Sequence, residues 1–198
     1  MKKPILLPVI TILVCAAILF GAAVGLNGVA AQNAQEAHLQ LMRTLLPGSE
    51  NFTVEPYAGE DANIVSVHKG ENGFVVETVT YGYAGNIRMF VGVSTEGKVT
   101  GLVVYRMEET FGLGANALTD HVFLAQFLNS EGTFAIGTPG ADAFSGATDT
   151  ATDTEDSVYV DGITGATVTS KAIARCVNSA VGYVTGADAS SAATSWGG

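Results

Sequence analysis

The sequence predicts an α+β domain, an antiparallel sheet meander with flanking helices, preceded by one N-terminal transmembrane helix. Three observations predict this class. An uncharged apolar stretch opens the chain, four segments of strand character follow with short turn-rich links, and a helical apolar stripe closes the domain. At 198 residues the chain has room for one ordinary domain besides this anchor.

The anchor is predicted at residues 4–26, where 18 of 23 residues are apolar. At 1.5 Å per residue this stretch crosses the roughly 30 Å hydrocarbon core of a bilayer. Lys2 and Lys3 precede it, and no charge follows until Glu36. The positive-inside rule therefore predicts a single-pass cell-membrane protein with residues 1–3 in the cytoplasm and an extracytoplasmic C-terminal domain. A cleaved signal peptide is the alternative, but its apolar segment is only about 7 to 15 residues long.

Charge and composition exclude several function classes. The formal net charge of −10 argues against nucleic acid, because phosphate binding needs a basic surface. The two cysteines, Cys15 in the predicted span and Cys176 in a predicted helix, provide no disulfide framework. The three histidines are far apart and lack ligand-like spacing, so we expect no metal site.

Residues 27–48 are predicted to form a linker that ends in an amphipathic helix, over 33–46, before Pro47-Gly48. The predicted domain, residues 49–186, opens with segments of strand character. These segments are 63–68, 74–81, 87–94 and 99–106. The short links between them are typical of antiparallel neighbours.

The second half of the domain has a glycine-rich loop after the last of these strands, and then a helix that Thr119 caps. The inward residues of that helix are predicted to be Phe123, Leu124, Phe127 and Leu128. Residues 138–157 are acidic and rich in threonine, which predicts a mobile surface loop. A strand at 158–160, a helix at 170–184 and a disordered tail at 187–198 complete the prediction.

The segment from Asp161 to Lys171 carries small residues and three threonines on a strand-to-helix turn. Free amide N–H groups and the helix dipole make such a turn a seat for phosphate. A plain alternative is that Thr167 or Thr169 only caps a surface helix.

Two motifs link the chain to a known family. Asp161, Thr164, Gly165, Ala166 and Thr167 match D-x-x-[ST]-G-A-T, and residues 109–114 match E-T-P-G-L-G except for Phe111 in place of proline. On these residues the chain resembles the FMN-binding domain shared by the G subunit of Rnf electron-transport complexes and the C subunit of sodium-pumping NADH:quinone reductase. The resemblance implies covalent FMN, attached through a phosphoester to Thr167 by a flavin transferase that acts on FAD.

The resemblance also implies the other cofactor-binding residues. Around the acceptor they are Asp161, Thr164, Gly165, Ala166, Thr169, Ser170 and Lys171, and in the glycine loop they are Glu109, Thr110, Gly112, Leu113 and Gly114. Lys171 is expected to offset phosphate charge, and the loop to let backbone approach the flavin ring. The alternative for the loop is a plain connecting turn. No catalytic residue and no metal ligand is expected.

A second match to the short motif ends at Thr148, which is therefore a secondary candidate acceptor. Asp149-Thr150-Ala151 follow it in place of a helix, so neither a helix dipole nor a lysine awaits a phosphate there. Thr167 is the preferred acceptor on this physical difference.

The predicted function is that of an electron-transfer flavoprotein subunit in a membrane-bound, redox-driven ion-translocating complex of the ferredoxin:NAD oxidoreductase type. It would work as part of that translocase without independent catalysis. The expected partners are the other membrane subunits, the flavin transferase and the lipid bilayer. A protein like the C subunit of the quinone reductase, or a flavinylated relay outside any ion pump, is the alternative, and a non-redox anchored sensor or adhesion domain is a further one.

Overall fold

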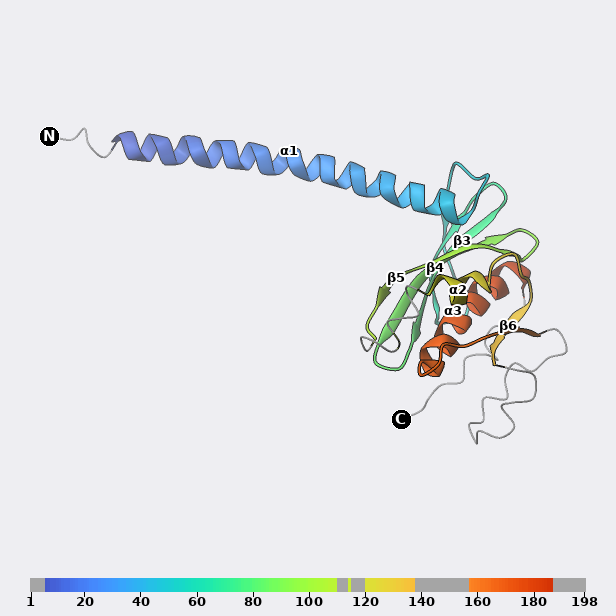
Figure 1. The fold of residues 1–198 in the computed structure, drawn as a ribbon. Coiled ribbons are helices and arrows are strands. Elements are labelled where there is room, and N and C mark those ends of the chain that lie inside the picture. The colour runs from blue at the N-terminus through green and yellow to red at the C-terminus, as the bar shows by residue number, and fades with distance from the viewer. Residues whose placement is uncertain (1–5, 110–113, 115–119, 138–156, 187–198) are drawn as a thin grey trace. The chain divides into compact units, whose positions relative to one another are not determined.

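The computed structural model describes residues 6–109, 114, 120–137 and 157–186 (Figure 1). They fall into two compact units, divided between Leu41 and Met42. The predicted acceptor Thr148, nearly all of the predicted acidic loop and the predicted tail at 187–198 lie outside the described residues.

The described part of the first unit, up to Leu41, belongs to the helix α1 (Leu6–Leu45). The sequence predicted a span at 4–26 and a separate helix at 33–46, and the good helix formers Ala30, Ala31 and Gln32 join the two regions. Among the residues that the structure describes, none of the helices has the length and apolar character needed to cross a membrane. The membrane span at 4–26 therefore stays a prediction.

The second unit is built on a five-stranded sheet in which every neighbouring pair is antiparallel. Its strands, adjacent in chain order, are β1 (Thr53–Glu55), β2 (Ile64–Lys69), β3 (Gly73–Tyr81), β4 (Asn86–Ser94) and β5 (Val99–Met107). The predicted meander is confirmed, and β1 is an additional edge strand of only three residues. A segment that short, with exposed residues at 53 and 54, has no alternation from which to predict it.

The longest pairing in the sheet is that of β3 with β4, which places one turn of the candidate site. Their register runs without a bulge from Gly73 opposite Ser94 to Tyr81 opposite Asn86. Residues 82–85 are left as the connecting turn, which the Gly82 N–H closes by donating to the Gly85 carbonyl at 2.8 Å.

A second layer covers one face of the sheet, where α3 (Thr167–Thr185) lies along β3 and β4 (Figure 1). Beside it are the short helix α2 (His121–Ala125) and a two-stranded sheet of β6 (Thr133–Ile136) and β7 (Ser157–Val160). β6 and β7 run parallel, and β6 was not predicted from the sequence. The fully buried side chains between the layers include Val67, Val76, Ile87, Met89, Val91, Phe127 and Ile173.

The ends of the helices differ from the prediction by a few residues. The side chain of Asp120 caps α2 by accepting from the N–H groups of Val122 and Phe123, whereas the predicted cap Thr119 lies outside the described residues. Leu128 was predicted to face inward but is 37% exposed, since α2 ends at Ala125 and the chain turns after it. Helix α3 begins at Thr167, three residues before the predicted start.

A buried asparagine joins the second layer to α3. Asn178 accepts a hydrogen bond from the Phe134 N–H at 2.8 Å and donates one to the Phe134 carbonyl at 2.9 Å. An amide side chain can satisfy both backbone groups at once, so β6 is held to α3 by paired bonds in a water-poor interior.

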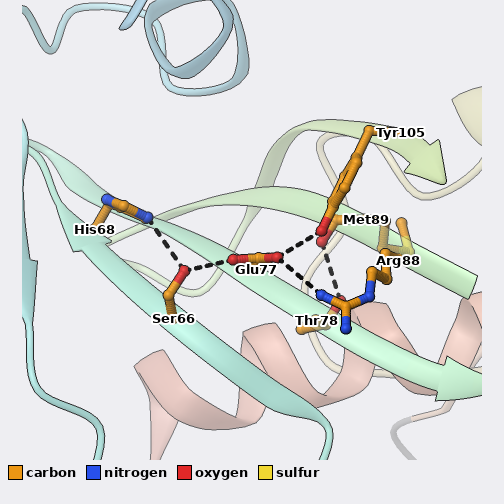
Figure 2. A network of polar contacts seen from close by, with 7 residues as sticks. All are labelled: Ser66, His68, Glu77, Thr78, Arg88, Met89 and Tyr105. Atoms are coloured by element: carbon orange, nitrogen blue, oxygen red, sulfur yellow. Dashed lines mark hydrogen bonds and ion pairs between the residues drawn. The ribbon is translucent and has the colours of Figure 1, made fainter. Parts of the chain in front are cut away.

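The opposite face of the sheet carries a polar network centred on Glu77 (Figure 2). Ser66 and Tyr105 donate hydrogen bonds to its two carboxylate oxygens, and the Arg88 guanidinium lies 3.7 Å from one of them. Burial and the hydrogen bond to Glu77 raise the pKa of Tyr105. Thr80, on the same strand as Glu77, instead donates to the Ala172 carbonyl of α3. Side chains three residues apart on a strand face opposite sides of the sheet, so the network lies on the face away from α3.

Candidate functional site

The predicted phosphate turn joins β7 to α3. At its start the Asp161 N–H donates to Gln126 Oε1 at 2.8 Å, and Gln126 Nε2 donates to the Asp161 carbonyl at 3.3 Å. At its end Gly165 has a φ of 79°, a left-handed conformation that favours glycine. The turn therefore requires glycine at 165 for a backbone reason.

Ser170 shapes the same turn from inside. Its hydroxyl donates to the Ala166 carbonyl and accepts from the Ile163 N–H, both at 3.0 Å. The side chain is fully buried, and these two bonds use its donor and one acceptor position. Ser170 thus fixes the entry of the chain into α3.

Thr167 is the first residue of α3 and is exposed. Ala166 occupies the N-cap position and makes no side-chain capping bond, so Thr167 is not the cap that the plain alternative assumed. The first amide N–H groups of a helix have no intrahelical acceptor, and the helix dipole adds positive potential there. An exposed hydroxyl thus stands at a helix N-terminus without a capping side chain.

Glu109 joins the other elements of the site. Its Oε1 accepts from the N–H of Tyr83 at 2.7 Å and from that of Ala84 at 3.3 Å. This approach depends on Gly82, because a Cβ at that position would lie 2.0 Å from the same oxygen. The carboxylate therefore fixes the 82–85 turn to the chain after β5.

Two buried polar atoms of the site lack a hydrogen-bond partner among the described residues. They are the second carboxylate oxygen of Glu109, Oε2, and the hydroxyl of Thr169, whose residue is 1% exposed. Both lie against Gly114, where a Cβ would stand 2.6 Å from Thr169 Oγ1 and 2.7 Å from Glu109 Oε2. Buried groups of this kind normally have a partner, so these two atoms are candidates for contact with a bound ligand.

The turn at Gly165, the start of α3, Glu109 and Gly114 line a pocket that is open to solvent. Its volume of about 360 Å³ is within the usual range for small-ligand sites. Six of the predicted site residues line it, namely Glu109, Gly114, Gly165, Ala166, Thr167 and Thr169. Asp161, Thr164, Ser170 and Lys171 are described but do not line it. The remaining predicted residues, Thr110, Gly112 and Leu113, lie outside the described residues.

The position of Lys171 differs from the one expected for it. Because α3 begins at Thr167, the lysine lies in the second turn of the helix and not in the first. The described part of the chain contains no cluster of three metal-ligating side chains.

Sequence reasoning missed two residues of the pocket, Tyr83 and Val168. The sequence signal for Tyr83 is an aromatic residue within the glycine-containing turn 82–86, where turn formation itself does not call for one. Val168 lies between two predicted threonines and is 45% exposed.

Comparisons with a family model and with individual proteins point to the same family. The model of the FMN-binding domain matches residues 82–182. The G subunit of an ion-translocating oxidoreductase complex of Methanosarcina acetivorans is 32% identical over 161 residues, which cover 75% of this chain and 76% of that protein. The G subunit of the proton-translocating ferredoxin:NAD(+) oxidoreductase complex of Clostridium ljungdahlii is 32% identical over 162 residues, covering 79% and 77%.

Among solved structures, the C subunit of the Na(+)-translocating NADH-quinone reductase of Parabacteroides distasonis aligns with a TM-score of 0.43 at 23% identity, over 61% of this chain and 60% of that one. NqrC of Shewanella oneidensis aligns with a TM-score of 0.44 at 20% identity, over 72% and 68%. The family match and the extent of the identity to the G subunits decide the assignment: the chain belongs to the FMN-binding domain family.

Proposed function

We propose that this chain is the flavin-carrying G-type subunit of a redox-driven ion-translocating oxidoreductase complex, with FMN bound covalently through Thr167. Family membership makes FMN the cofactor, and the relatives are subunits of such complexes. The main support for the site assignment is the pocket. It is lined by the exposed Thr167 and by Glu109 and Thr169, the residues with the two unpartnered buried polar atoms.

The residues of the pocket fit an FMN group. The uncapped first turn of α3 offers amide N–H groups to a phosphate, and Thr167 offers a hydroxyl for a phosphoester. The Thr169 hydroxyl can donate and the Glu109 carboxylate can accept, which suits the mixed donors and acceptors of a flavin nucleotide. Because Gly114 has no side chain, the space directly beside these two atoms is not filled by a Cβ.

Each part of the chain has a separate task in this proposal. Bound FMN supplies one- and two-electron transfer. Gly165 and Ser170 hold the turn so that Thr167 stays exposed, and Glu109 fixes the 82–85 turn beside it. In a reaction that we assign to a flavin transferase, the Thr167 oxygen loses its proton and attacks the flavin-side phosphorus of FAD. The bond from that phosphorus to the bridging oxygen breaks, and AMP leaves with that oxygen.

The proposal includes a membrane anchor at residues 4–26, a cytoplasmic N-terminus and a domain outside the cytoplasm. Support comes from large apolar side chains of α1 that are exposed, such as Ile12 at 68%, Leu19 at 71% and Phe20 at 73%. Water disfavours such a surface, whereas lipid covers it without cost. A reporter that works only outside the cytoplasm, fused after Gly198, should be active, and an active cytoplasm-only reporter there would overturn the topology.

Covalent attachment is tested by substituting the acceptor. We expect Thr167→Ala to abolish flavin fluorescence of the denatured protein band and Thr148→Ala to leave it at the wild-type level. Thr148 is the matched control because it ends a copy of the same short motif. Intact mass of protein made with and without the flavin transferase gives the stoichiometry. A Thr167→Ala band as fluorescent as wild type would refute the assignment.

A further inference from the structure

The side chain of Tyr83 is placed unusually for a residue of a tight turn. It lines the same pocket as the first turn of α3, yet 69% of its surface is exposed. With most of its surface in water, Tyr83 gains little from the fold by hydrophobic burial. Its position beside a ligand pocket indicates a role that is fulfilled when the pocket is filled.

The backbone of Tyr83 is held firmly although its ring is exposed. The Tyr83 N–H donates to Glu109 Oε1 at 2.7 Å, the Ala84 N–H donates to the same oxygen, and Gly82 and Gly85 close the turn. The Tyr81 hydroxyl adds a bond to the Ala84 carbonyl at 3.3 Å. The ring is therefore presented to the pocket from a fixed point of attachment.

The pocket thus combines three kinds of surface. It has an aromatic ring at Tyr83, a polar part at Glu109 Oε2 and Thr169 Oγ1, and a helix N-terminus at Thr167. A flavin nucleotide has a planar ring system, hydrogen-bonding groups on that ring and its side chain, and a phosphate. The three surfaces match these three parts in chemistry.

We propose that Tyr83 stacks on the isoalloxazine ring and that Glu109, besides offering Oε2 to the flavin, positions Tyr83 through its Oε1. The inference rests on the proposed function, since it requires a flavin attached at Thr167. Offset stacking of two aromatic systems favours the docked ring by a factor of roughly 2 to 12. Docking on Tyr83 shields the flavin ring from water and leaves the phosphoester at Thr167 unchanged.

The experiment uses the full-length flavinylated protein and two readouts. Fluorescence of the denatured band reports attachment, and quenching of native flavin fluorescence by iodide reports how far the ring is accessible to water. We expect Tyr83→Ala to keep the full band and to become more accessible to iodide, by at most the roughly two- to twelve-fold loss of docking. Tyr83→Phe, which keeps the ring, should behave like wild type.

Tyr81→Ala is the matched control. Tyr81 is also an exposed tyrosine, at 63%, and also contacts the 82–85 turn, but it does not line the pocket. Its removal takes one hydrogen bond from the turn but leaves Glu109 and the Tyr83 ring in place, so we expect a much smaller change in iodide quenching than in Tyr83→Ala. Equal effects of Tyr81→Ala and Tyr83→Ala, or no effect of Tyr83→Ala, would overturn the stacking.

The positioning role of Glu109 has its own pair of variants. Glu109→Gln keeps an oxygen that accepts from the Tyr83 N–H, whereas Glu109→Ala removes it. Glu109→Gln keeps one acceptor oxygen for the turn but loses the second one, so we expect ring exposure to rise in Glu109→Ala and to rise less in Glu109→Gln; equal exposure in both would refute the role. A wild-type band without fluorescence would instead overturn the attachment and the inference together, so the two failures are distinguishable.

Discussion

Substituting Gly114 by alanine tests the pocket and the packing around it at once. The new Cβ would meet side-chain atoms of Thr169 and Glu109. It would lie 2.6 Å from Thr169 Oγ1 and 2.7 Å from Glu109 Oε2, where ordinary contact begins at 3.4 Å. Glu109 cannot simply recede, because its other oxygen holds two N–H groups of the 82–85 turn.

The cost follows from these overlaps. Overpacking of a tightly packed site costs about 1 to 3 kcal/mol of unfolding free energy. For a domain of this size that lowers the Tm by roughly 3 to 9 °C. Because the new methyl group covers the two unpartnered atoms, we also expect the flavin ring to become more accessible to iodide. Thermal unfolding followed by circular dichroism and iodide quenching measure the two effects.

Gly162→Ala provides the matched control. Its Cβ would lie 2.6 Å from Ile136 Cγ2, a comparable overlap, but with an apolar side chain outside the pocket lining. We expect this variant to lose stability while the flavin keeps its wild-type accessibility. If Gly114→Ala melts with the wild-type Tm and leaves iodide quenching unchanged, the described geometry of Glu109 and Thr169 is refuted.

Two further predictions concern the core and its pH dependence. Asn178→Ala removes the hydrogen-bond partner of the buried N–H and carbonyl of Phe134. We therefore expect the free energy of unfolding, measured in urea, to fall by about 2 to 4 kcal/mol, and a fall below about 1 kcal/mol would contradict this prediction. Burial and the bond to Glu55 raise the pKa of Tyr183, so the native state keeps this proton at a pH where the unfolded chain releases it. Unfolding free energy should therefore fall as pH rises above about 10, and less steeply in Tyr183→Phe; equal slopes would contradict this.

The sequence predicts the sheet well because alternation and turn chemistry are local. Strands β2 to β5 carry apolar side chains on a sheet face against α3, and glycine or asparagine marks each link between them. Strand β6 was not predicted, because the interactions that form it are made with residues far away in the sequence. Its backbone is paired with β7, more than twenty residues later, and its Phe134 with Asn178 on α3.

The pocket shows the same division between local and distant signals. The motif covers Gly165 of the strand-to-helix turn and Thr167 at the start of α3, and such a turn is a local pattern. Tyr83 was not predicted, because its place in the site depends on Glu109, which lies 26 residues further along the chain. A hydrogen bond between residues this far apart produces no periodic pattern in the sequence from which it could be predicted.

Thr169 and Ser170 show what a motif leaves undecided. They are adjacent hydroxyl residues, both implied as cofactor ligands by the same resemblance, and both are buried. Adjacent residues of an α-helix point about 100° apart, so the two hydroxyls leave α3 in different directions. Ser170 bonds back to the Ile163–Ala166 turn, and Thr169 is left without a partner beside Gly114. The start of α3 therefore decides which hydroxyl serves the turn and which is available to a ligand.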